Sequence, residues 1–67
     1  TPKDMVNEYY VIMDLENFHQ YLDNKGQLGL FLNAKEFFYK KDAVKFLIEQ
    51  AYPGQYTIIT VYRVTEY

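Results

Sequence analysis

The pattern of hydrophobic and polar residues divides the chain into three parts, with turn signals at residues 23–26 and 53–54 between them. The first part opens at residues 9–13 with aromatic and β-branched side chains, over a length that suits a strand. The alternation of a strand gives it two faces, which carry Tyr9, Val11 and Met13 on one side and Tyr10 and Ile12 on the other. This segment is therefore predicted to be the first strand.

Residues 15–23 allow two interpretations. Three apolar residues have the i, i+3, i+7 spacing of a short helix, namely Leu15, Phe18 and Leu22. Residues 16–19 can instead turn the chain, so that residues 20–22 return as a second strand. We favour the hairpin.

The second part changes its period near residue 40. The apolar run at residues 28–32 is too short for a helix, and residues 34–38 are predicted to form another short strand. A helix is predicted over about residues 40–52, with Asp42 in its first turn, where a negative charge suits the helix dipole, and with Pro53-Gly54 as its stop. Its core-facing residues are predicted from their spacing to be Val44, Leu47, Ile48 and Ala51.

The third part, residues 56–66, alternates over a length that predicts a long strand. We assign one face to the helix and core, with Tyr56, Ile58, Thr60, Tyr62 and Val64, and the other face to Thr57, Ile59, Val61, Arg63 and Thr65. Residues 1–67 are thus predicted to form a single two-layer α+β domain. In it a three- or four-stranded antiparallel sheet carries one helix on one face, in the order β-β-β-α-β.

The segment from residue 34 onward resembles a known layout. The segment Ala34-Lys35-Glu36-Phe37 is followed after five residues by Ala43, then by an amphipathic run to Glu49 and the strand that begins at Tyr56. This order is similar to that of small α+β accessory proteins from bacteriophages and mobile elements of Gram-positive bacteria. The resemblance implies a role in binding and disabling a host protein, and it supplies no catalytic residue. In such proteins a Ser or Thr often caps the helix, where this chain has Tyr39.

The composition fits a small domain that depends on aromatic bulk. The chain has eight Tyr and five Phe but no Cys, so neither disulfides nor thiolate metal sites can stabilise it. We expect four tyrosines in the core and at its rim: Tyr9, Tyr52, Tyr56 and Tyr62. The missing cysteines favour a reducing compartment, and we expect a cytoplasmic protein with no membrane span. Residues 1–5 are expected to be disordered or to be added residues outside the fold.

The chain offers little catalytic chemistry. His19 is the single histidine, there is no Ser or Cys nucleophile, and one His cannot complete a zinc site. The acids Asp14, Glu16 and Asp23 lack the spacing of a calcium loop, and we interpret them as a solvated edge. We therefore expect no enzymatic activity, no catalytic residue, no metal and no cofactor.

Two binding functions remain from the sequence. The lysines near the aromatic residues 37–39 could hold single-stranded nucleic acid: Lys35, Lys40, Lys41 and Lys45. The net charge of −2 and the interspersed acids argue against this alternative. The preferred hypothesis is binding of a protein on the sheet face that the helix leaves uncovered, by Tyr10, Ile12, Tyr21, Ile59, Val61 and Arg63. The long strand could also pair with a copy of itself in a homodimer.

Overall fold

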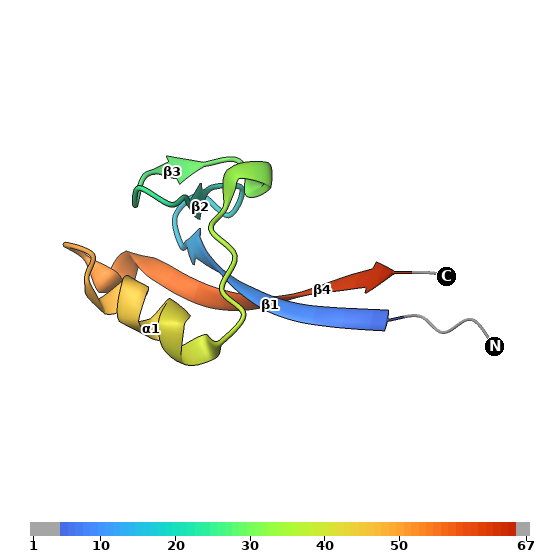
Figure 1. Ribbon diagram of the computed structural model, residues 1–67. Helices are drawn as coiled ribbons and strands as arrows, with labels where there is room; N and C mark the ends of the chain where they lie inside the picture. The colour runs from blue at the N-terminus through green and yellow to red at the C-terminus, as the bar shows by residue number, and fades with distance from the viewer. Residues whose placement is uncertain (1–4, 66–67) are drawn as a thin grey trace.

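The fold is a four-stranded antiparallel sheet with one helix on one face (Figure 1). The computed structural model describes residues 5–65, and the side chains of residues 8–63. The elements follow in the order β1 (Met5–Asp14), β2 (Tyr21–Leu22), β3 (Leu28–Gly29), the 3-10 turn η1 (Phe31–Asn33), α1 (Lys40–Ile48), the 3-10 turn η2 (Pro53–Gln55) and β4 (Tyr56–Thr65). The strand order across the sheet is β3-β2-β1-β4. The predicted α+β class is confirmed, with the helix before the last strand.

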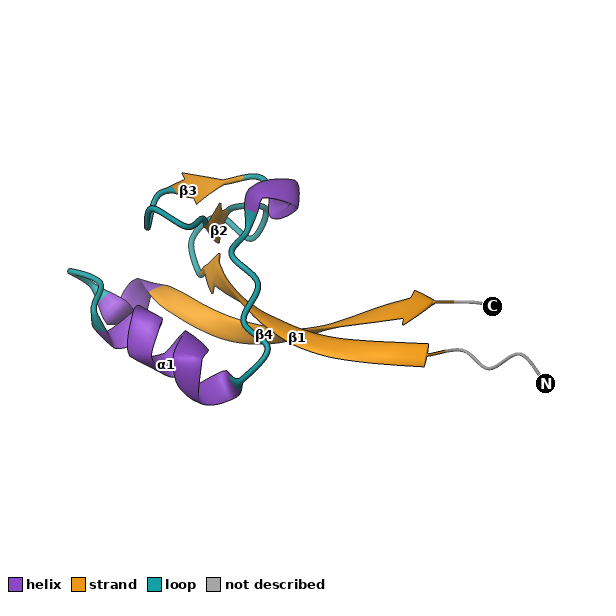
Figure 2. Cartoon of the chain, in the orientation of Figure 1, coloured by secondary structure: helices purple, strands orange, loops and turns teal. Residues whose placement is uncertain are grey.

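The longest feature of the fold is the two-stranded ribbon of β1 and β4. The two strands pair along their whole length, from Met5 opposite Thr65 to Asp14 opposite Tyr56. Their β-branched and aromatic side chains favour this extended pairing. Figure 2 shows the ribbon continuing well past α1, toward the two ends of the chain. Met5, which we expected outside the fold, is the first residue of β1, and residues 1–4 lie outside the described part.

The favoured hairpin after β1 is the observed structure. Asp14 is almost completely buried, and its carboxylate accepts hydrogen bonds from the Glu16 backbone N–H and the Asn17 side-chain amide, each at 3.2 Å. These bonds fix the turn, because an acidic side chain that binds its own following backbone competes with helix formation. β2 then returns with Tyr21 opposite Met13.

The prediction of a strand at residues 34–38 is wrong. This segment is extended, but only Phe37 pairs with β1, exchanging hydrogen bonds of 2.7 and 2.9 Å with Tyr10. The segment connects η1 to the start of α1 (Figure 1). On the way, the Lys35 N–H donates a 3.0 Å hydrogen bond to the Leu22 carbonyl of β2, and Phe37 then meets β1 at one point. The third strand is instead the two-residue β3, within the run at residues 28–32.

The helix is shorter than predicted and is turned about its axis. It ends at Ile48 rather than near residue 52. Gln50 follows this end, and its side chain donates a 2.9 Å hydrogen bond back to the Phe46 carbonyl in the last turn. Tyr39 begins the helix without a side-chain cap, as expected from its lack of a short hydroxyl or carboxylate. The buried residue is Ala43, whereas Val44 and Ile48, which we predicted to face the core, are 40% and 65% exposed.

The core lies between α1 and the sheet. Its buried members are Ile12, Leu22, Phe37 and Ala43, and half-buried side chains from all neighbouring elements surround them: Tyr10, Phe46, Leu47, Tyr56 and Ile58. Among the tyrosines expected in the core or at its rim, Tyr9 is buried and Tyr56 is half-buried. Tyr52 and Tyr62 are exposed, which corrects the prediction. Tyr52 follows the end of α1, and Tyr62 belongs to the C-terminal half of β4, where the ribbon continues past α1 (Figure 2).

Candidate functional site

Among the residues that the structure describes, no strand pairs with the outer edge of β4. β4 is last in the strand order, so it pairs with β1 on one side only. The Tyr10 N–H donates to the Phe37 carbonyl and the Tyr10 carbonyl accepts from the Phe37 N–H, and therefore Thr60 opposite Tyr10 is not hydrogen-bonded to β1. By the alternation of antiparallel strands, the backbone N–H and C=O groups of Ile58, Thr60 and Tyr62 point outward. We call these outward groups the free edge of β4.

One side of α1 extends apolar side chains toward this edge. On a helix with 3.6 residues per turn, Phe46 lies on one side of the buried Ala43, and Val44 and Ile48 lie on the other. Phe46 packs on Phe37, with ring centroids 5.4 Å apart, and Phe37 borders β1 on the side away from β4. Val44 and Ile48 therefore face the β4 side, and we call these two residues the outer flank of α1. The outer flank is an exposed apolar surface next to unpaired backbone groups.

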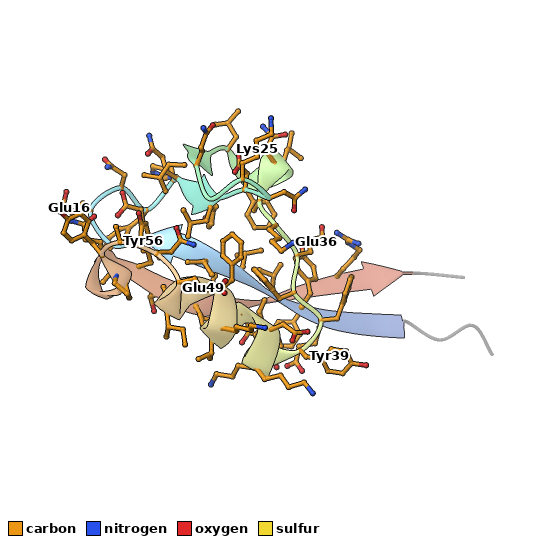
Figure 3. All side chains as sticks on the ribbon, turned by 60° about the vertical axis from the view of Figure 1, so that its left-hand side comes forward. Glu16, Lys25, Glu36, Tyr39, Glu49 and Tyr56 are labelled. Carbon is orange, nitrogen blue, oxygen red and sulfur yellow. The ribbon has the colours of Figure 1, made fainter. Side chains whose placement is uncertain are left out.

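The charge of β4 is directed away from its free edge. Arg63 reaches across the sheet face opposite α1, where its guanidinium lies 4.9 Å from the centroid of the Tyr9 ring. Its Nη2 donates a 2.9 Å hydrogen bond to Oε2 of Glu36, which lies on the segment before α1 and is labelled in Figure 3. The hydrogen bond to Glu36 raises the pKa of Arg63 above its ordinary value. Arg63 therefore lies over the sheet face, held by Glu36 and Tyr9, and it is the only charged side chain described in β4.

The structure separates the residues predicted to bind a protein. Tyr10 and Ile12 do not lie on the uncovered face: Ile12 is fully buried in the core under α1, and Tyr10 packs against that core. The register explains this correction, because Ile12 stands opposite Ile58 and shares its face. Alternation along each strand predicts its two faces but does not show how the faces of β1 and β4 match.

The other predicted residues do lie on the face opposite α1. Ile59 and Val61 are there as assigned, but they are half-buried, and their cross-strand neighbours Val11 and Tyr9 are buried. Tyr21 is also half-buried, with its ring edge-to-face with Phe31 at 5.1 Å. This face is therefore less accessible than the sequence suggested. The more exposed apolar residues, Ile48 and Tyr62, are ones that the prediction assigned to the core.

A second exposed apolar surface follows β3. Within the run at residues 28–32, Leu30 is 66% exposed and Leu32 is 91% exposed. Phe31 is more shielded, because its ring lies against Tyr21. The segment is short and curved into η1, so it offers apolar side chains without a row of backbone groups.

The predicted basic group does not form one surface. The Lys35 ammonium lies over the rings of the buried Phe37 and the half-buried Phe46, 5.5 and 5.7 Å from their centroids, and Lys35 is itself half-buried. Lys41 lies 5.8 Å from the ring of Tyr39, which stands at the start of α1 (Figure 3). Lys40 and Lys45 are exposed on the helix. Cation–π contacts occupy two of the four lysines, so nothing in their arrangement favours nucleic-acid binding.

The acidic residues serve turns. Asp23 accepts hydrogen bonds from the backbone N–H of Gln27 at 2.9 Å and of Lys25 at 2.8 Å, and Gly26 in the same turn has a φ of 78°. Beside this turn is a polar hollow of about 290 Å³, lined by Asp23, Asn24, Lys25, Gln27 and Asn33. All five lining residues are polar or charged, whereas ordinary small-molecule sites are lined mainly by hydrophobic and aromatic side chains. His19 is exposed, and the described residues contain no cluster of side chains that could hold a metal ion.

The Asp23 turn makes a testable contribution to acid stability. The hydrogen bonds from Gln27 and Lys25 lower the pKa of Asp23 below its ordinary value of 3.8. The stabilisation is therefore present above pH 3.8 and is lost as the pH falls through the lower folded-state value. We expect Asp23→Asn to have a small effect at neutral pH and to flatten the loss of stability below about pH 4. Urea unfolding as a function of pH measures this, and identical pH profiles for the two proteins would contradict it.

No protein-family model, curated protein or solved structure was found to match this chain. The resemblance to phage accessory proteins therefore stays a prediction. No helix among the described residues is long and apolar enough to cross a membrane. The geometry of the free edge of β4 and the outer flank of α1 thus supplies the main argument about function.

Proposed function

We propose that this protein is a non-enzymatic binding module that takes up an extended segment of another protein along the free edge of β4. The observation that carries the proposal is a ten-residue strand at the end of the sheet, with outward backbone groups and an apolar helix flank beside them. Addition of a strand to a sheet edge is a common mode of peptide recognition.

The edge supplies both affinity and selectivity in this proposal. The main-chain groups of Ile58, Thr60 and Tyr62 would form the new ladder, and each buried backbone bond contributes about 0.5–1.5 kcal/mol. Alternate side chains of the bound segment would lie on the α1 side, against the outer flank of Val44 and Ile48. Apolar residues at every second position are therefore the preferred chemistry of the bound segment.

Binding of this kind acts sterically. A segment held along β4 is unavailable to any other partner, so a protein that uses the same segment for its own contacts would be inhibited. This agrees with the inhibitory role that the sequence resemblance implies, and it requires no catalytic group.

A proline at position 60 tests the proposal. Thr60→Pro removes an outward N–H and adds a ring at the edge, and it leaves the bonds between β1 and β4 in place. We expect the immobilised variant to capture its protein partner from lysate about tenfold less, or worse, than the wild type. Thr60→Val is the matched control, because it keeps the N–H and the side-chain shape.

Quantitative mass spectrometry of the captured proteins gives the readout. A partner that is retained by the wild type and Thr60→Val, but lost by Thr60→Pro, supports the proposal. Circular dichroism has to show that all three chains are folded. If folded Thr60→Pro captures the same proteins in the same amounts, the edge of β4 is not the binding site.

A further inference from the structure

The free edge of β4 is chemically complementary to itself. We propose that its occupant is β4 of a second copy of this chain, paired antiparallel about a two-fold axis at Thr60. The inference rests on the proposed use of the β4 edge and names the partner there. It follows from the register that the outward groups allow, from the side chains which that register brings together, and from the charge at the edge.

The positions of the outward groups restrict the register. In a symmetric antiparallel pair, outward groups must meet outward groups, so the axis passes through a residue and not between two residues. Overlap of Tyr56–Thr65 with itself is greatest when that residue is Thr60 or Val61. With the axis at Val61, Tyr62 would face Thr60 and Arg63 would face Ile59 of the second copy.

The axis at Thr60 gives the better matched pairs. Tyr62 then faces Ile58 of the second copy on the α1 side, and Val61 faces Ile59 of the second copy on the other side. Thr60 faces Thr60 of the second copy, and Arg63 faces Thr57 of the second copy. Aromatic with β-branched pairs and Thr with Thr pairs are favourable between strands, by about 0.2–1 kcal/mol each.

The same register covers the exposed apolar residues near the edge. Tyr62 is 63% exposed, because α1 packs over the other half of β4, where Ile58 and Tyr56 contact the core. In the pair, Tyr62 lies beside Ile58 of the second copy, on the α1 side of the sheet. The outer flank of that copy extends past the edge of its own sheet toward this position. Each chain thus brings an uncovered aromatic ring to the other chain's uncovered helix flank, twice by symmetry.

Charge does not oppose the pairing. Residues 56–62 contain no charged side chain, so two copies of this stretch meet without like charges. The only charged side chain described in β4, Arg63, is held inward by Glu36 and Tyr9. Residues 56–62 also contain no proline and no bulge, which are further devices that protect the edge strands of monomeric proteins. The pairing would join the two sheets into one continuous sheet, a gain for a chain whose own core is small.

The oligomeric mass gives the first test. For the purified full chain we expect sedimentation equilibrium to give twice the 8.1 kDa of one chain, in a concentration-dependent way. Thr60→Pro is expected to sediment as a folded monomer. Tyr62→Lys, at an exposed position with an unchanged backbone, is expected to raise the dissociation constant about tenfold or more. The second variant keeps the test valid if the proline disturbs the fold.

The register gives the second test. The chain has no cysteine, so an introduced cysteine is the only thiol that a cross-linker can react with. Thr60→Cys places two thiols at the axis, within reach of a short bismaleimide cross-linker. Thr57→Cys is the matched control on the same strand, where the two thiols would lie about 20 Å apart along the strands. We expect efficient cross-linking of Thr60→Cys and little of Thr57→Cys, and equal cross-linking of both would overturn the register.

The outcomes separate this inference from the proposed function. A folded wild-type chain that stays monomeric over the whole concentration series overturns the second copy as the occupant, even where Thr60→Pro still loses a captured partner and the proposed function stands. A dimer that is unchanged in Thr60→Pro and Tyr62→Lys places the interface elsewhere and also overturns the inference. A dimer that both variants weaken, with no other Thr60-dependent partner, supports the inference and argues against the proposed function.

Discussion

Replacing Ile12 with alanine is expected to remove a large part of the stability of this domain. Ile12 is fully buried at the centre of the core, between Leu22, Phe37 and Ala43. Loss of such a side chain costs about 2–5 kcal/mol, because the removed atoms lose burial and a cavity remains. A domain of 67 residues has a free energy of unfolding of only about 3–10 kcal/mol.

Denaturant unfolding followed by circular dichroism measures the effect of Ile12→Ala. Leu32→Ala is the control, because Leu32 has the same size as Ile12 but is exposed. Its replacement should change the free energy of unfolding by less than about 0.5 kcal/mol. The sequence pattern had assigned Ile12 to a binding face. If Ile12→Ala unfolds at the same denaturant concentration as Leu32→Ala, that assignment is right and the core described above is wrong.

Local patterns predicted the elements that depend on local chemistry. The alternation of β-branched and aromatic residues at 9–13 and 56–66 marked the two long strands. The hairpin after β1 also follows from short-range signals, because Asp14 and Asn17 form the turn with their neighbours. The antiparallel sheet with one helix follows from the order of these elements.

The failures concern the matching of faces, which no single segment determines. Alternation gives each strand two faces, but the pairing of Ile12 with Ile58 depends on the register between residues 46 positions apart in the sequence. The two hydrogen bonds between Tyr10 and Phe37 also join distant parts of the chain, and they direct the backbone groups of Tyr10 away from β4. These contacts are non-local, so the assignment of Tyr10 and Ile12 to the uncovered face could not be checked from the sequence.

The sequence of the helix contains a signal, the width of its apolar stripe, that the prediction of its buried face did not use. Its apolar residues cover more of the circumference than one buried stripe needs: Ala43, Val44, Phe46, Leu47 and Ile48. A stripe that wide indicates two contacts, one with the core and one with something else. The smallest of these residues, Ala43, takes the closest approach to the sheet, which leaves the outer flank exposed. Volume as well as hydrophobicity therefore decides which side of α1 is buried.

Lysine at position 43 and lysine at position 44 are expected to have opposite consequences. Ala43 is fully buried, and a charged side chain there has neither space nor a partner, so Ala43→Lys should leave the domain unfolded. Val44 is 40% exposed, and a lysine there can extend its ammonium group into water. Lysine is also the better helix former, so Val44→Lys should change the stability of a single chain by less than about 0.5 kcal/mol.

The comparison is best made in the Thr60→Pro background, where pairing through β4 does not contribute to stability. Circular dichroism and denaturant unfolding then report on the single chain alone. In the otherwise wild-type chain, Val44→Lys should keep the fold and weaken the dimer, because Val44 belongs to the outer flank. If Val44→Lys unfolds the chain and Ala43→Lys does not, the helix has the rotation that hydrophobic spacing alone predicts. The outer flank would then be part of the core, and it would offer no apolar cover to a strand added at β4.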